Sequence, residues 1–293
     1  MMQETRLSVA LVTRNRPASL ERTLKSLRSQ DVQPWEIIVS DDSNADRAAE
    51  VRRIATTHDC RYIAGPRRGL YANRNFVALA CQGTHIRTMD DDHEFPPDHL
   101  SECMGAIVRD PEAVWIIGEY LPTEAHKGAP PLCPGQLHPR GFSVAPRNPD
   151  DCWAIADGAT IYPREIFDSG VRFPEAFPFG AAYLEFGSRL HFLGYRIRQL
   201  TSTYVIHHYE QAKRSIIDPE KEQAAEFYAM LCHSFIYQRS LKNQVLSVLQ
   251  IAWMILRRRD CAINALRAAL PEYRTQARAM KGTTAAMISI SSR

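Results

Sequence analysis

Apolar and polar residues form alternating blocks along the first 121 residues, and these blocks predict strands and helices in turn. Short runs rich in β-branched and other apolar residues predict strands at residues 7–13, 35–43, 60–65, 85–89 and 113–121. Between them, apolar residues recur every three or four positions and predict helices at residues 18–30, 45–58, 70–83 and 96–110. This order is typical of an α/β fold in which helices flank a mostly parallel central sheet.

The pattern changes after residue 121. Residues 122–151 are rich in Pro and Gly and show no sustained period, which predicts an irregular but ordered loop that is mobile over the site. Strand and helix signals then return, and the chain beyond Asp218 is helical in pattern. We therefore expect an α/β domain at residues 1–217 and a helical C-terminal extension at residues 218–293.

Polar residues gather directly after three of the predicted strands. Thr13 and Arg16 follow the first strand, Asp41 and Asp42 end the second, and the run from Asp90 to Glu94 follows the fourth. Open α/β sheets bind ligands at the carboxyl ends of their strands. The sequence therefore predicts a binding site at this edge.

Three aspartates stand in a row at Asp90, Asp91 and Asp92. Neighbouring carboxylates raise one another's pKa unless a cation offsets them, and a hard divalent ion with oxygen ligands is the usual partner. In an extended stretch, Asp90 and Asp92 point to one side, toward an ion and a nucleotide's pyrophosphate, and Asp91 points toward ribose or solvent. An acidic surface loop or a helix cap is the alternative.

Composition narrows the class of protein. The 293 residues are 45% apolar, which is enough for a full core, and the net charge of +3 does not indicate a nucleic-acid partner. Seven cysteines without C-x-x-C spacing indicate neither a disulfide framework nor a zinc site. The start lacks a signal-peptide pattern, and residues 245–256 are too short an apolar run to span a bilayer. We expect a cytoplasmic protein.

Residues 7–30, 37–43, 69–100 and 172–197 together resemble family 2 glycosyltransferases with the GT-A fold, and the similarity extends roughly over residues 7–209. The resemblance implies an inverting transferase that moves a sugar from a nucleotide-diphosphate donor to an acceptor hydroxyl. The resemblance leaves the acceptor open among a glycan, a lipid-linked molecule and a small molecule. The resemblance also implies Mn²⁺ or Mg²⁺ as cofactor.

The resemblance assigns residues to two sets. For the nucleotide sugar it implies Thr13, Arg16, Asp41 or Asp42, Arg74, Asn75 and Asp90, and the side-chain alternation described above adds Asp91. For the metal it implies Asp90, Asp92, and His207 or His208. Each has a structural alternative: a helix start, a helix cap, a surface ion pair or a hydrogen-bonded histidine.

The catalytic base departs from the family pattern. Family members usually carry a Glu-Asp pair where this chain has Ala182 and Tyr183. We expect Glu185 to be the base because apolar neighbours raise the pKa of a carboxyl group, although an i,i+4 ion pair with Arg189 is the alternative. Asp157 is the second choice, because Gly158 leaves room for a substrate.

Two other functions compete with this interpretation. The absent acidic pair favours a non-catalytic nucleotide-sugar-binding protein. A nucleotidyltransferase usually carries a Gly-rich phosphate loop near its start, and residues 12–19 contain no Gly.

The C-terminal extension carries apolar residues at helical spacing: Phe227, Leu231, Phe235, Leu246, Leu249, Trp253 and Leu256. Such a stripe predicts packing against the first domain or against a second subunit. The alternative is peripheral membrane contact, with Arg257, Arg258, Arg259 and Arg267 near anionic headgroups.

Overall fold

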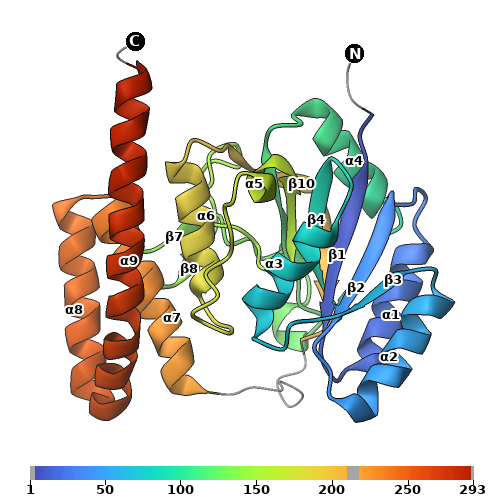
Figure 1. The fold of residues 1–293 in the computed structure, drawn as a ribbon, viewed down its shortest axis with the longest axis horizontal. Coiled ribbons are helices and arrows are strands. Elements are labelled where there is room, and N and C mark those ends of the chain that lie inside the picture. The colour runs from blue at the N-terminus through green and yellow to red at the C-terminus, as the bar shows by residue number, and fades with distance from the viewer. Residues whose placement is uncertain (1–3, 210–217, 292–293) are drawn as a thin grey trace.

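A computed structural model describes residues 4–209 and 218–291 (Figure 1). Eight strands form its central sheet in the order β3-β2-β1-β4-β9-β6-β10-β5. The strands are β1 Leu7–Thr13, β2 Glu36–Asp41, β3 Arg61–Ala64, β4 His85–Asp90, β5 His93–Glu94, β6 Val114–Tyr120, β9 Ala159–Pro163 and β10 Ile197–His207. Among the described strands of this sheet, only β9 and β5 run antiparallel to their neighbours, so the predicted α/β fold with a mostly parallel sheet is confirmed.

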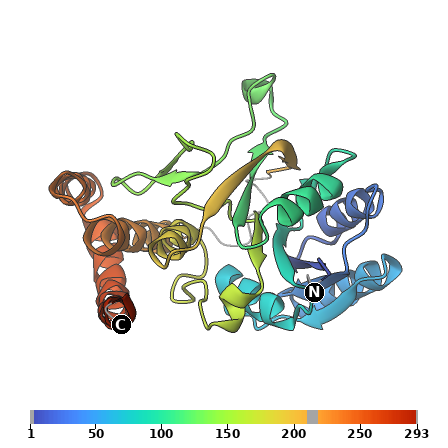
Figure 2. The same cartoon turned by 90° about the horizontal axis from the view of Figure 1, so that it is seen from above.

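Helices connect the strands and cover both faces of the sheet. They are α1 Pro17–Arg28, α2 Ala45–Thr57, α3 Leu70–Ala80, α4 His99–Arg109, α5 Glu165–Asp168 and α6 Ala182–Phe192. In Figures 1 and 2, α3 lies on one face of the sheet while α1 and α2 lie together on the other. All seven residues of β1 are buried, which explains its continuous apolar run.

The short strand β5 was not predicted, because two residues carry no periodic signal. It pairs antiparallel with the end of β10, which places His93 opposite His207 and Glu94 opposite Ile206. This pairing brings the aspartate run after β4 beside the late histidines, although more than 100 residues separate them in the chain.

The irregular segment after β6 is organised by short pairings. It contains the 3₁₀-helix η1 Glu124–His126, the strand pair β7 Gln136–Leu137 and β8 Ser143–Val144, and a bridge between Glu119 and Leu132. Seen from above, the segment projects from the sheet (Figure 2). The irregular, ordered part of the prediction is confirmed.

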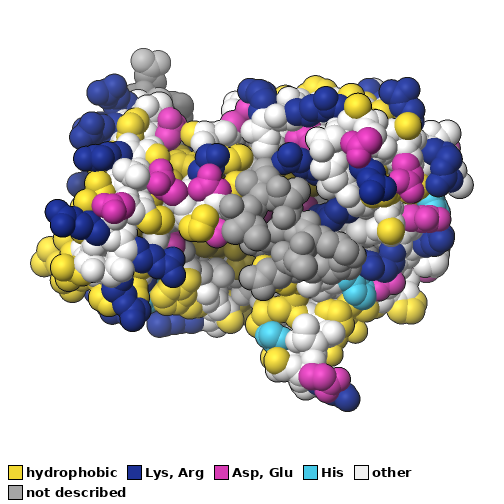
Figure 3. Space-filling model, turned by 90° about the horizontal axis from the view of Figure 1, so that it is seen from below, with side chains coloured by type: hydrophobic (Ala, Val, Ile, Leu, Met, Phe, Trp, Pro, Cys, Tyr) yellow, Lys and Arg dark blue, Asp and Glu magenta, His cyan; other side chains and the backbone are white. Residues whose placement is uncertain are grey.

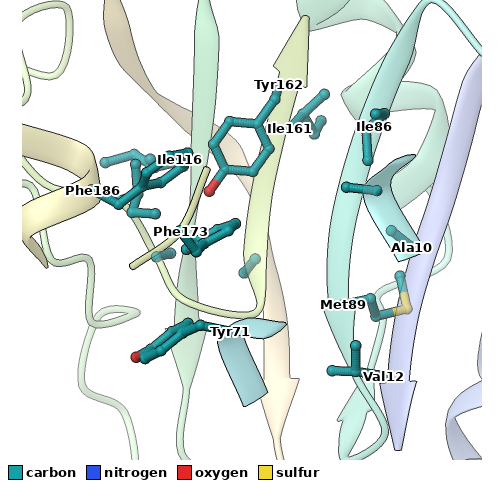
Figure 4. Packing of buried hydrophobic residues seen from close by; sticks show 14 of the residues in the cluster. Ala10, Val12, Tyr71, Ile86, Met89, Ile116, Ile161, Tyr162, Phe173 and Phe186 are labelled. Carbon is teal, nitrogen blue, oxygen red and sulfur yellow. The ribbon is translucent and has the colours of Figure 1, made fainter. Parts of the chain in front are cut away.

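Aromatic side chains join the sheet to α3 and α6. Figure 4 shows the rings of Tyr71, Phe173, Phe186 and Tyr162 gathered in one part of the core. The ring centroids of Phe173 and Phe186 lie 4.1 Å apart, and those of Tyr71 and Phe173 lie 5.8 Å apart. This contact fixes α3, which carries Arg74, relative to α6, which carries Glu185.

The C-terminal helices are α7 Pro219–Cys232, the π-helix η3 His233–Tyr237, α8 Leu241–Arg257 and α9 Arg259–Ser291. In Figure 2 they form a layer at one side, with α6 between them and the sheet. Phe227 of α7 is fully buried, whereas Leu249 and Leu256 of α8 are exposed. The predicted apolar stripe therefore packs along α7 and remains uncovered along α8.

Among the described residues, no helix is both long enough and apolar enough to cross a membrane. Residues 210–217, which contain the predicted end of the first domain at residue 217, lie outside the described residues. The division into two domains stays a prediction.

Candidate active site

A cavity of about 1070 Å³ opens at the carboxyl ends of the parallel strands. Its wall includes residues from all three of the predicted polar clusters and from the segment at residues 130–145. The predicted site residues that line it are Thr13, Arg16, Asp42, Asp90, Asp92, Asp157 and His207. The fold therefore brings most of the predicted site to one place.

Asp91 turns into the protein interior. Its side chain is fully buried, accepts a hydrogen bond of 2.6 Å from the Thr13 hydroxyl, and forms an ion pair with Arg16. The Thr23 hydroxyl donates to the Asp91 carbonyl oxygen at 2.8 Å. The predicted orientation toward ribose or solvent is wrong, because Asp91 ties the start of α1 to the end of β4.

Arg74 holds two of the carboxylates of the site. Its side chain is fully buried, and its Nη2 atom lies 2.9 and 3.1 Å from the two carboxylate oxygens of Asp90. Its Nε atom lies 3.2 Å from Oδ1 of Asp157. Arg74 therefore positions Asp90 and Asp157 from beneath the cavity wall.

Arginine side chains offset part of the negative charge of the three aspartates, for which the sequence predicted a metal ion. Arg74 pairs with Asp90, and Arg16 pairs with Asp91 and Asp92, with 2.7 Å between Arg16 Nη1 and Asp92 Oδ2. The remaining carboxylate oxygen of Asp92 faces two histidines rather than an arginine.

Asp92, His93 and His207 form a cluster with the spacing of a metal site. One ligand atom from each residue lies within 4.8 Å of the others. Both ring nitrogens of His93 are buried and make no hydrogen bond to the described residues, and the buried Oδ1 atom of Asp92, also without a hydrogen bond there, lies 3.5 Å from His207 Nε2. Buried polar atoms without hydrogen-bond partners cost free energy, and a cation bound between Asp92 and His93 would offset that cost.

Glu119 orients His207 toward that cluster. Its Oε2 atom lies 2.9 Å from His207 Nδ1, and His207 Nε2 lies 3.5 Å from Asp92 Oδ1. Burial disfavours the charged imidazole, but Asp92 and Glu119 outweigh it and raise the pKa of His207 to about 10. A carboxylate behind a histidine is typical of metal sites, where it fixes the ring and its tautomer.

His208 does not join this cluster. Its Nε2 atom pairs with Glu94, and His208 is not among the residues that line the cavity. The structure thus separates the two candidate histidines, and His207 is the one that faces the site. Asp90 also lies outside the cluster, because Arg74 holds its carboxylate.

The predicted nucleotide residues divide in a similar way. Asp42 lines the cavity and accepts the Arg67 backbone N–H at 2.9 Å, whereas Asp41 is buried and accepts the Tyr62 hydroxyl at 3.1 Å. Asn75 bonds the Phe173 carbonyl oxygen at 3.0 Å, away from the cavity wall, and Asn73 lines the cavity instead.

Glu185 does not reach the cavity, contrary to its expected role as base. Its carboxylate is fully buried, lies 3.3 Å from Arg189 Nη2, and accepts a hydrogen bond from the Tyr237 hydroxyl. Burial raises the pKa of Glu185, although Arg189 opposes the rise. This geometry supports the alternative of a structural ion pair. Asp157, the second choice, lines the cavity beside Tyr183.

Glu119 and Glu226 are cavity residues that sequence reasoning missed. Glu119 lies inside a buried strand, and Glu226 lies on an α7 turn whose other residues read as packing positions. Burial raises the pKa of Glu226 to about 7. No motif marks either position, so only the three-dimensional fold could identify them.

Comparison with solved structures identifies the fold. The Staphylococcus aureus protein TarS, in a crystal structure of residues 1–349 with UDP, matches with a TM-score of 0.59 and 14% identity over 86% of this chain and 72% of that chain. GalNAc-T7 with UDP, GalNAc and Mn²⁺ matches with a TM-score of 0.62 and 15% identity over 88% of this chain and 58% of that chain. The fold is therefore that of the GT-A glycosyltransferases.

Two curated proteins are similar over part of the sequence. The putative colanic acid biosynthesis glycosyl transferase WcaA of Escherichia coli is 33% identical over 98 residues, covering 32% of this chain and 35% of that protein. The GalNAc(5)-diNAcBac-PP-undecaprenol beta-1,3-glucosyltransferase of Campylobacter jejuni is 34% identical over 107 residues, covering 34% of this chain and 33% of that protein. The chain thus spans about a third of the length of the curated relatives it matches.

The sequence profile of glycosyl transferase family 2 covers most of the sheet. It matches residues 8–170, more than half of the chain, from β1 to the end of the segment containing α5. The matched region contains the aspartate run, Arg74 and Asp157. This chain therefore belongs to glycosyl transferase family 2.

Proposed function

We propose that the protein is an inverting, divalent-metal-dependent glycosyltransferase that uses a nucleoside diphosphate sugar. The observation that supports this most directly is the cluster of Asp92, His93 and His207, of which Asp92 and His207 line the cavity. TarS and GalNAc-T7, which share the fold, were crystallised with UDP.

The donor set fits a metal that accepts both oxygen and nitrogen. Asp92, His93 and His207 would hold the ion, and Glu119 would keep the His207 ring in position. Carboxylate and imidazole together favour Mn²⁺ over Ca²⁺, and Mg²⁺ is the alternative. When bound, the ion would offset the negative charge that develops on the departing diphosphate.

The chain's own residues divide the remaining work. Asp42, at the end of β2, would accept hydrogen bonds from the nucleoside, as the resemblance implies. Arg16, whose side chain is 28% exposed, would add positive charge beside the diphosphate while keeping its ion pair with Asp92. Both side chains lie in the wall of the same cavity.

Asp157 is our candidate for the general base. It lies in the cavity wall, where it can take the proton from an acceptor hydroxyl, and its carboxylate is held by Arg74 at 3.2 Å. Burial raises the pKa of Asp157, with Arg74 opposing the rise. A raised pKa makes a carboxylate a better proton acceptor near neutral pH.

The acceptor would enter between the segment at residues 130–145 and α7. Leu132, Phe142 and Val144 give this side of the cavity an apolar wall, and Glu222 and Glu226 add two carboxylates. The Campylobacter jejuni relative is named for an undecaprenol-linked acceptor. We propose a lipid-linked glycan as the acceptor class and a cytoplasmic site of action.

A donor screen tests this proposal. Purified protein is incubated with a panel of nucleoside diphosphate sugars and Mn²⁺, donor hydrolysis and transfer are measured, and the anomeric configuration of the product is read by NMR. We expect turnover of one donor with inversion. Asp157→Asn should lower turnover roughly 100-fold or more while donor binding changes little.

The same screen distinguishes the competing function. Ala181 and Tyr183 line the cavity close to where family members carry their acidic pair, which favours a protein that binds a nucleotide sugar without transferring it. Donor-dependent thermal stabilisation without turnover of any donor would support that alternative and contradict ours. Retention at the anomeric carbon would contradict the inverting mechanism.

A further inference from the structure

We propose that α8 docks the protein on an anionic lipid surface. The outward face of this helix is apolar along its whole length. Six exposed side chains make up this face: Leu241 (78% exposed), Val245 (47%), Val248 (55%), Leu249 (59%), Trp253 (46%) and Leu256 (86%). Their spacing of three or four residues places them on one stripe of the helix. Figure 3 shows hydrophobic side chains at the edge of the molecule where α8 lies, with Lys and Arg around them.

The opposite face of α8 is already anchored to the protein. The buried Ser247 hydroxyl donates to the Pro139 carbonyl oxygen at 2.7 Å and lies 2.7 Å from the Ser234 hydroxyl. The α8 helix therefore packs through Ser247 and the partly buried Ile251, Met254 and Ile255, and it leaves a second apolar stripe outward. A stripe of this size on a soluble surface indicates a binding surface.

Charge around the stripe indicates what covers it. Residues 227–259 contain no acidic residue, and five cationic side chains in this span are exposed: Arg239, Lys242, Arg257, Arg258 and Arg259. The guanidinium of Arg257 lies 4.7 Å from the centre of the Trp253 ring. An apolar face flanked by cations, with a Trp at its border, matches the interface of an anionic bilayer.

Docking through α8 would also bring the candidate active site close to the lipid. Pro139, which accepts the Ser247 hydrogen bond, lies in the segment at residues 130–145 that walls the cavity. Because α8 has 17 residues, its stripe would lie along the surface for roughly 25 Å. The proposal concerns lipid binding alone, so testing it requires neither a nucleotide-sugar donor nor catalytic turnover.

Vesicle co-sedimentation of the full chain tests the proposal. We expect binding to phosphatidylcholine vesicles that contain phosphatidylglycerol and much weaker binding to pure phosphatidylcholine. The triple variant Arg257→Gln, Arg258→Gln, Arg259→Gln should bind roughly 100-fold more weakly, because each cation near such a surface contributes about fivefold.

The apolar face is tested by Val245→Glu with Leu249→Glu, which should abolish binding. The matched control is Leu79→Glu with Val108→Glu, two residues of α3 and α4 that are 54% and 71% exposed. This control should bind like the wild type. In a Trp35→Phe background, Trp253 is the most exposed of the three remaining tryptophans, because Trp115 is buried and Trp153 is partly buried. The emission should shift to the blue when anionic vesicles are added, and a further Trp253→Phe substitution should remove that shift.

Three results would overturn the proposal. The first is failure of the wild type to bind anionic vesicles. The second is equal loss of binding in the control at residues 79 and 108. The third is a concentration-dependent dimer in sedimentation velocity that Val245→Glu with Leu249→Glu dissociates, because the stripe would then be covered by a second copy of the chain.

Discussion

Replacing Glu185 with Gln separates a structural carboxylate from a catalytic one. Glu185 is fully buried, its carboxylate lies 3.3 Å from Arg189 Nη2, and it accepts a hydrogen bond from the Tyr237 hydroxyl. The Gln side chain keeps the shape and can still accept from Tyr237, but it leaves the Arg189 guanidinium without its counter-charge. We therefore expect lower stability with unchanged chemistry.

The magnitude follows from the burial of the pair. Removing one partner of a buried ion pair costs about 3–5 kcal/mol. Because Arg189 also donates to the Arg172 carbonyl oxygen at 2.6 Å, we expect the lower end, about 3 kcal/mol. For a chain of this size, that lowers Tm by roughly 5–10 °C.

The assay combines urea unfolding, thermal unfolding and initial rates measured well below the Tm of the variant. Glu21→Gln is the matched control, because Glu21 pairs with Lys25 at the same i,i+4 spacing on an exposed helix face and should change neither quantity. Adding Arg189→Met to Glu185→Gln should restore part of the stability, because no buried charge then lacks a partner. If Glu185→Gln unfolds like the wild type but turns over 100-fold more slowly, Glu185 is the base and our interpretation is wrong.

Two further substitutions test the cavity. Gly158→Ala would place a Cβ atom 2.3 Å from Asp90 Oδ2. We therefore expect this substitution to displace the Asp90 carboxylate and to raise the KM for the donor about tenfold. Gly105→Ala is the control, because its Cβ atom would meet nothing within 4 Å, and it should leave the KM unchanged. The pKa of Glu226 is raised to about 7 in the fold, above its ordinary value of 4.5, so its contribution to stability is complete below pH 4.5 and is lost as pH rises through 7. Between pH 5.5 and pH 8, the free energy of unfolding measured in urea should therefore fall by about 2 kcal/mol more in the wild type than in Glu226→Gln. An identical pH dependence in both proteins would refute this.

The sequence predicted the order of the main elements because each depends on local patterns. The buried apolar run of β1 and the three-to-four spacing of α1 require no knowledge of distant contacts. In contrast, β5 exists only because β10 lies beside it. A strand of two residues that forms only beside a distant strand leaves no periodic pattern in the sequence.

The sequence predicted the location of the site better than it predicted the role of each residue. The carboxyl ends of the strands identify the edge, but the direction of Asp91 depends on Thr13 and Arg16, which approach from another strand and helix. The role of Glu185 depends on Tyr237, which is 52 residues away. Long-range hydrogen bonds of this kind decide whether an acid serves structure or chemistry.

The apolar stripe of the C-terminal extension shows the same limit. Helical spacing correctly predicted helices, yet it predicted the same packing role for Phe227 and Leu249. In the structure, α7 is enclosed by α6 and α9, while α8 lies at the edge. Burial depends on the neighbours that a helix acquires, and periodicity alone does not reveal them.

Manganese binding measured by electron paramagnetic resonance tests the central claim most directly. With UDP present, we expect the wild type to bind one Mn²⁺, Glu119→Gln to bind it about 10–100-fold more weakly, and His207→Ala to lose binding further. His208→Ala is the matched control, because His208 pairs with Glu94 outside the cluster, and it should bind like the wild type. Equal Mn²⁺ affinity in His207→Ala and His208→Ala, or no binding by the wild type, would contradict the assignment of a metal site to Asp92, His93 and His207.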